Sequence, residues 1–81
     1  MNKTTVKLIA VARNRLAASL RKARANAGLT QATVAERAGM HPRSYQKIEA
    51  GSVSTTIDRI AKLSSALGID PVELFEEKRR S

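Results

Sequence analysis

Helix-breaking residues divide this chain into short stretches that each have the periodicity of an α-helix. Between the breakers, apolar residues recur at intervals of three and four positions, and no run of alternating β-branched residues appears. The pattern therefore predicts an all-α fold. The breakers are Gly28, Gly39, Pro42, Gly51, Gly68 and Pro71.

Five helices are expected from these stretches. Thr30 is a suitable N-cap for the second helix, Thr55 with Asp58 can form a variant capping box for the fourth, and Asp70 can cap the fifth. The apolar stripe of the fourth helix is expected to include Ile57. The expected helices span about residues 5–27, 31–38, 42–50, 54 or 55 to 67, and 71 onward, with a charged tail at 76–81.

A length of 81 residues makes one domain, 1–81, with enough apolar material for one small core. The absence of cysteine excludes disulfides and thiolate ligands, and the single histidine argues against zinc, so no metal or cofactor is expected. The apolar run before Arg13 is too short to span a membrane or to form a signal-peptide core. A cytoplasmic location is therefore expected.

The charge is strongly positive and unevenly distributed. The formal net charge is +8, with twelve basic and three acidic residues in 1–69, against three basic and four acidic residues in 70–81. A basic domain favours a polyanionic partner, with nucleic acid first and an anionic membrane second. A membrane-surface helix usually carries Trp or Phe, but the chain has no Trp and Phe75 lies in the acidic part, so no membrane partner is expected.

The stretch 31–50, QATVAERAGMHPRSYQKIEA, predicts two short helices that meet at Gly39. Glycine can adopt the left-handed conformation that a tight turn between helices needs, and the small Ala35 lets the helices cross closely. In the second helix of this pair, expected over residues 42–50, the polar side chains point away from the apolar face of that helix. This geometry is typical of a helix–turn–helix motif, whose second helix fits the major groove of DNA.

The same stretch, with LRKAR before it and LSSALGI after it, resembles the lambda-repressor/Cro-type helix–turn–helix, or XRE family. The resemblance covers Leu16 to Phe75 and leaves residues 1–15 as an N-terminal extension that lengthens the first helix. The fold it implies is a five-helix lambda-repressor-like domain. The matching residues are Arg24, Gly28, Leu29, Thr30, Gln31, Val34, Ala35, Gly39, Ile48, Glu49, Gly51, Ile57, Ile60, Leu63, Ala66, Leu67 and Gly68.

The resemblance implies two groups of DNA contacts. Those expected to face base edges lie on the second helix of the motif, and are Arg43, Gln46 and Lys47, with Pro42 and Ser44 beside them. Those expected to contact the DNA backbone lie before these helices and in the loop after them, and are Thr30, Gln31, His41, Ser52, Ser54, Thr55 and Thr56. The alternative for Arg43 and Lys47 is a solvated helix face without a partner.

Three positions depart from the family pattern. Pro42 stands where a polar base-reading residue is common, and Thr55 replaces a frequent proline. Tyr45 replaces an aliphatic core residue, so its hydroxyl must reach a partner or water. The resemblance also places Arg24 beside Glu49, where a bidentate ion pair would join the first helix to the recognition helix.

One motif of this size reads too few base pairs for a unique genomic site, so a homodimer on a palindromic operator is expected. Its apolar seam is predicted at Leu74 and Phe75, with Val53 as a possible third member, although Leu74 and Phe75 could simply close the core. The apolar residues of the N-terminal extension, Val6, Leu8 and Ile9, could add to this seam.

The function expected from these observations is sequence-specific binding of duplex DNA by a transcriptional regulator, most often a repressor or autoregulator. Its size suits a phage or plasmid repressor, or a controller of a restriction–modification operon. The alternative is an antitoxin that binds its own promoter and a toxin protein. An enzyme is not expected, because no paired carboxylates, phosphate loop or nucleophile–base set is evident. RNA binding is disfavoured because Tyr45 and Phe75 are the only aromatics.

Overall fold

The computed structural model describes residues 1–75, and every regular element within that range is helical. The four α-helices are α1 (Lys3–Ala27), α2 (Gln31–Arg37), α3 (Pro42–Glu49) and α4 (Ile57–Leu67), and a 3₁₀ turn, η1 (Pro71–Leu74), follows them. The predicted all-α class is confirmed, and α2 and α3 end within one residue of their predicted ends. The tail predicted at residues 76–81 lies outside the described residues.

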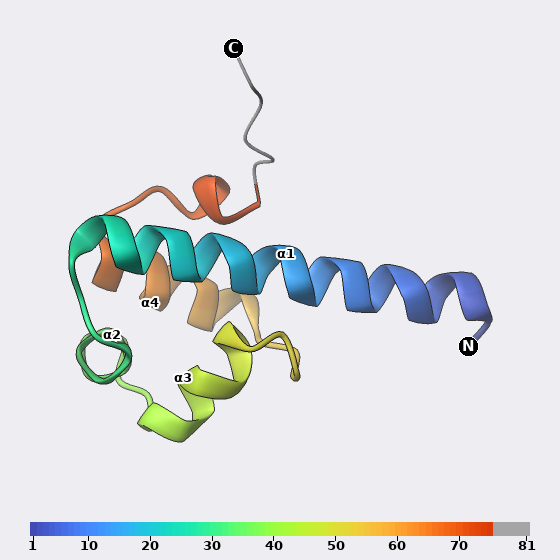
Figure 1. Cartoon of the computed structure of the whole chain (residues 1–81), viewed down its shortest axis with the longest axis horizontal. Coiled ribbons are helices and arrows are strands. Elements are labelled where there is room, and N and C mark those ends of the chain that lie inside the picture. The colour runs from blue at the N-terminus through green and yellow to red at the C-terminus, as the bar shows by residue number, and fades with distance from the viewer. Residues whose placement is uncertain (76–81) are drawn as a thin grey trace, which may run out of the picture.

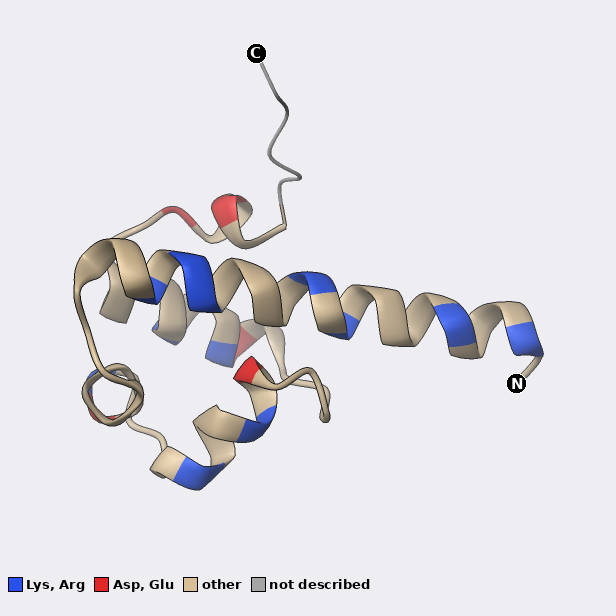
Figure 2. Cartoon of the chain, in the orientation of Figure 1, with Lys and Arg blue, Asp and Glu red and all other residues tan. Residues whose placement is uncertain are grey.

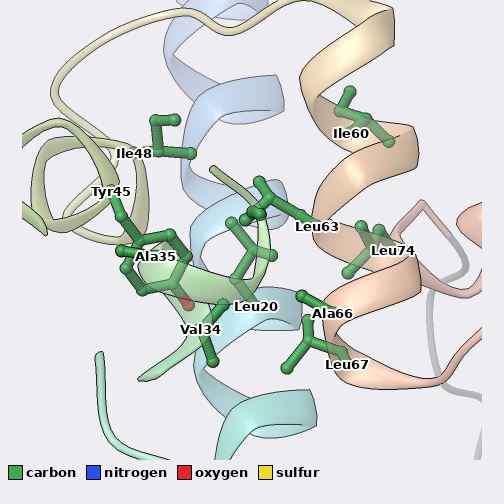
Figure 3. Packing of buried hydrophobic residues seen from close by; sticks show 11 residues of the cluster. Leu20, Val34, Ala35, Tyr45, Ile48, Ile60, Leu63, Ala66, Leu67 and Leu74 are labelled. Carbon is green, nitrogen blue, oxygen red and sulfur yellow. The ribbon is translucent and has the colours of Figure 1, made fainter. Parts of the chain in front are cut away.

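The core lies where the second half of α1 meets the other helices (Figure 1). Leu20 of α1, Tyr45 of α3 and Leu63 of α4 each have no measurable exposure, and Figure 3 shows them pointing toward one another. The first half of α1 continues beyond this core, so the predicted extended first helix is present (Figure 1). The remaining core side chains are Val34, Ala35, Ala38, Ile48, Ile60, Ala66, Leu67 and Leu74.

The fourth helix begins later than predicted. Thr56, not Thr55, is its N-cap, and the Thr56 hydroxyl accepts a hydrogen bond from the backbone N–H of Arg59 at 3.1 Å. Ile57 was expected in the apolar stripe, but its side chain is 75% exposed because it lies in the first turn, ahead of the part that packs on the core. The stripe therefore starts at Ile60.

The predicted fifth α-helix is a single 3₁₀ turn. Its start is as expected, because Asp70 accepts from the N–H of Val72 at 2.9 Å and Glu73 accepts from the N–H of Asp70 at 3.0 Å. Leu74 is only 1% exposed and packs in the core, so it is not available for the dimer seam to which it was assigned. Phe75, in contrast, is 58% exposed.

Candidate nucleic-acid interface

The helix–turn–helix motif is built as the sequence predicts. Gly39 has a positive φ of 69°, and the next residue, Met40, donates its N–H to the carbonyl of Ala35 at 2.8 Å. Ala35 has no exposed surface, so a larger side chain there would push α2 and α3 apart. This tight turn fixes the angle at which α3 leaves α2.

Helix α3 has one buried face and one exposed face. Tyr45, Ile48 and Glu49 are buried, and Ser44 is half-buried at the edge. The residues on the outer face are all exposed, and they are Pro42, Arg43, Gln46 and Lys47. The base-reading residues expected from the family resemblance therefore lie on one accessible surface, apart from Ser44, which lies at its margin.

The first turn of α3 is organised by His41 and Pro42. The Nδ1 atom of His41 accepts a hydrogen bond from the backbone N–H of Arg43 at 3.1 Å, so this histidine is the N-cap of α3. Pro42 occupies the first helical position, where an N–H would have no intrahelical partner. Both residues therefore have a structural role in starting α3, whatever they contact outside the protein.

A buried network joins the inner end of α3 to α1. The Nε of Arg24 donates to Oε2 of Glu49 at 2.8 Å, and its Nη2 donates to Oε1 at 2.8 Å. Glu49 is 3% exposed and Arg24 is 24% exposed, so this bidentate ion pair is largely shielded from water. A third guanidinium nitrogen of Arg24 donates to the carbonyl of Leu29 at 3.0 Å, which ties the α1–α2 turn to the same network.

Tyr45 completes this network. Its hydroxyl donates a hydrogen bond to Oε2 of Glu49, which supplies the partner that the sequence required for this aromatic replacement. Burial first, and then the bond to Glu49, raise the pKa of the Tyr45 hydroxyl, so it remains a neutral donor. Burial alone would raise the pKa of Glu49, but hydrogen bonds from Arg24, Tyr45 and Gln31 outweigh it and hold this pKa below its ordinary value.

The start of α2 is attached to the same carboxylate. The side-chain amide of Gln31 donates to Oε1 of Glu49 at 2.9 Å, while the hydroxyl of Thr30 accepts from the N–H of Thr33 at 3.1 Å. Sequence reasoning placed Thr30 and Gln31 at the DNA backbone but did not anticipate the bond between Gln31 and Glu49. Gln31 is half-buried as a residue, and its amide nitrogen has a second hydrogen that the bond to Glu49 does not use.

The loop after α3 is held close to α1. Gly51 has a positive φ of 76°, and a Cβ atom there would lie 2.5 Å from Oδ1 of Asn14, so only glycine fits without movement. The guanidinium of Arg13 donates to the hydroxyl of Ser54 at 2.9 and 3.2 Å. Sequence reasoning missed Arg13 and Asn14 because neither contact has a local sequence signal.

The hydroxyl groups of this loop differ in their availability. Ser52 is exposed and donates to the carbonyl of Lys47 at 3.0 Å, and exposed Thr56 caps α4. The hydroxyl of Thr55 is buried and has no hydrogen-bond partner among residues 1–75. This hydroxyl therefore does not reach the surface, whereas Ser52, Ser54 and Thr56 are exposed residues of the loop.

Charge differs between the two sides of α1. Figure 2 shows basic positions on α3, below α1 in that view, and acidic positions around η1, above it. The basic residues on the outer face of α3 are Arg43 and Lys47, and the acidic residues around η1 are Asp70 and Glu73. The α3 side is therefore more favourable for a polyanion than the surface around η1.

A helix–turn–helix family model matches residues 20–74, which include the last part of α1, the whole motif, α4 and η1. This chain belongs to the XRE-type helix–turn–helix family of DNA-binding transcription regulators. The predicted resemblance is thereby confirmed. Proteins of this family are generally not enzymes, in agreement with the sequence-based expectation.

Two solved structures resemble the chain over most of its length. The restriction–modification controller protein C.AhdI from Aeromonas hydrophila is 33% identical, with a TM-score of 0.76, over 78% of this chain and 96% of that one. The clp gene regulator ClgR from C. glutamicum is 28% identical, with a TM-score of 0.76, over 79% of this chain and 83% of that one. No curated protein matches the chain in sequence.

Neither a metal-binding cluster nor a membrane-crossing helix is found in residues 1–75. No group of three or more His, Asp or Glu side chains is placed to hold a metal ion there. No helix in that range combines the length and the apolar composition that crossing a bilayer requires.

Proposed function

We propose that this XRE-family protein binds a specific palindromic sequence in duplex DNA as a homodimer and represses transcription from the promoter that contains it. The observation that carries the proposal is the division of α3, whose buried face is held by Arg24 and whose exposed face presents Arg43, Gln46 and Lys47. A helix with this exposed set fits the major groove, where side chains reach base edges.

Affinity and specificity have different sources in this proposal. Arg43 and Lys47 approach the groove, with Arg43 donating two bonds to a guanine and Gln46 pairing with an adenine. The start of α2, at Thr30 and Gln31, and the loop with Ser52 and Ser54 contact phosphates on either side. Each neutralised phosphate makes the observed affinity fall more steeply with salt.

The hydrogen-bond network around Glu49 is proposed to fix the orientation of α3, which carries the base-contacting residues. Because Arg24, Gln31 and Tyr45 all bind one carboxylate, α1, α2 and α3 are fixed relative to one another before DNA arrives. Binding then costs little ordering of the protein, which favours affinity. Both Arg24 and Glu49 are structural residues in this proposal and do not contact bases.

Two copies are needed because one motif reads only a few base pairs. A two-fold axis would place the two α3 helices in successive major grooves, with half-site centres about 10 base pairs apart or a multiple of that. Exposed Phe75 and half-buried Val53 are the remaining members of the proposed seam. Similarity to C.AhdI, a restriction–modification controller protein, supports the use of this protein as a controller of a restriction–modification operon.

The test is selection of bound duplexes from a random pool, followed by sequencing. The proposal predicts a two-fold symmetric consensus with two half-sites, and its enrichment should be absent for Arg43→Ala combined with Gln46→Ala. Lys62→Ala, on the exposed surface of α4, is the matched control and should return the wild-type consensus. Recovery of unselected sequences by the wild-type protein would contradict the proposed function.

A further inference from the structure

The N-terminal part of α1 projects from the domain as a helix with apolar side chains in water. We call residues 3–12 the overhang; all of them are exposed except the half-buried Ile9. Val6 is 53% exposed, Leu8 62% and Val11 45%. Figure 1 shows α1 continuing well past the other elements over this range.

The sequence of the overhang is a poor one for an unsupported helix. Five of its ten residues are β-branched, which lose side-chain freedom in a helix. Its charges, Lys3 and Lys7, lie near the positive end of the helix dipole, and the first turn has no acidic residue. Asn2 caps the helix through the N–H of Thr5 at 2.8 Å, but one cap stabilises by only about 1 kcal/mol. The overhang therefore needs packing from another surface.

A second exposed apolar surface has the opposite charge. We call Asp70, Val72, Glu73 and Phe75 the η1 patch. Val72 is 56% exposed and Phe75 58% exposed, and the two carboxylates lie on the same short turn. Because Leu74 is anchored in the core, the turn is held in place and presents a firm surface.

The overhang and the η1 patch are complementary but lie apart in one chain. The overhang is basic without any acidic residue, and the patch is acidic without any basic residue. In one chain η1 packs on the domain, while the overhang runs away from it (Figure 1). Only another molecule can therefore bring the two together.

We propose that the overhang of each subunit packs on the η1 patch of a second copy of this chain, reciprocally about the two-fold axis. The inference rests on the homodimer of the proposed function and names the surfaces that form it. Apolar side chains of the overhang cover Val72 and Phe75 of the partner copy. Asp70 and Glu73 then lie near the positive end of the partner's α1 dipole, where carboxylates are favourable.

This arrangement is compatible with DNA binding and is preferred to an alternative. The η1 patch lies on the side of α1 opposite α3, so covering it leaves the exposed face of α3 free (Figure 1). Packing two overhangs against each other would instead bring Lys3 and Lys7 of one copy near those of the other. Like charges at close range oppose that contact.

Cysteine crosslinking tests the proposal directly, because the full sequence contains no cysteine that could compete with an introduced thiol. Val6→Cys protein is mixed with Val72→Cys protein of different mass and then oxidised. Each chain has one thiol, so a mixed disulfide is necessarily intermolecular. We expect this product at several times the yield obtained with Ala32→Cys, an exposed α2 control, in place of Val72→Cys. A yield equal to the control, or a predominance of Val6–Val6 disulfides, would overturn the proposal.

Hydrogen exchange of backbone amides gives a second test, which does not need an introduced disulfide bond. The amides of residues 6–12 should exchange at least about tenfold more slowly at concentrations where the protein is dimeric. Phe75→Asp should abolish this protection although it lies on a different element, while binding to a single half-site duplex is retained. Protection that persists in Phe75→Asp would contradict the inference. Failure of the wild type to select a DNA consensus would instead count against the proposed function alone.

Discussion

The two faces of α3 differ in whether their side chains are bonded within the protein or exposed to solvent. On the inner face, Tyr45 and Glu49 are buried and bonded to residues of α1 and α2, so nearly every polar atom has a partner within the protein. On the outer face, Arg43, Gln46 and Lys47 are exposed. The same eight-residue helix therefore contains residues whose substitution should change stability beside residues whose substitution should change DNA binding.

The largest effect is expected from breaking the inner network. Glu49→Gln removes the charge that compensates Arg24, and loss of one partner of a buried pair typically costs about 3–5 kcal/mol in free energy of unfolding. Urea or thermal unfolding measures this cost. The exposed Glu36→Gln in α2 is the matched control and should change stability by less than about 0.5 kcal/mol. Equal effects of the two substitutions would contradict the role of Glu49 in the buried network.

Replacing both members of the pair should cost less than the sum of the single replacements. Arg24→Met leaves the Glu49 carboxylate buried without its cation, but Glu49→Leu together with Arg24→Met leaves neither charge unpaired. A double-mutant cycle on the free energy of unfolding should give a coupling of about 1–3 kcal/mol. Additive effects would show that the pair is not energetically coupled.

Acid should weaken the inner face before it affects the outer one. The pKa of Glu49 is lowered in the folded state, so its stabilisation is present above the unfolded-state pKa and is lost as pH falls through the folded-state pKa. The melting-temperature difference between wild type and Glu49→Gln should therefore be constant near pH 7 and shrink below about pH 4. A difference that is independent of pH would contradict the assigned charge state of Glu49.

The smallest effect is expected in the loop after α3. Ser52→Ala removes an exposed hydroxyl and should change stability by less than about 0.5 kcal/mol. If Ser52 contacts phosphate, this substitution weakens binding to all duplexes by a similar factor, because phosphate contacts carry no sequence information. Fluorescence anisotropy with operator and random duplexes distinguishes this result from a change in specificity.

The sequence predicts the helices well where local signals are unique. Gly28 ends α1, Thr30 caps α2 and Pro42 begins α3. Each of these boundaries is predictable because no adjacent residue gives a competing signal. The start of α4 was misplaced because Ser54, Thr55 and Thr56 are adjacent and each could serve as a cap. In the structure the Thr56 hydroxyl accepts from the N–H of Arg59, so Thr56 is the cap that forms.

Contacts between distant segments were less predictable. The pairing of Arg24 with Glu49 was expected only through the family resemblance. The bonds from Arg13 to Ser54 and from Arg21 to the carbonyl of Glu49, at 2.7 Å, had no signal in the sequence. Which of the neighbouring residues Leu74 and Phe75 turns inward depends on the direction of a single 3₁₀ turn, which periodicity over so few residues does not fix.

The most direct test of the account is Arg43→Ala measured on a selected operator and on random duplex DNA. If the outer face of α3 reads bases, this substitution should cost about 1–3 kcal/mol of binding free energy on the operator, relax preference at one base pair of each half-site, and leave the free energy of unfolding unchanged. An equal loss of affinity on operator and random DNA would contradict the base-reading role of α3.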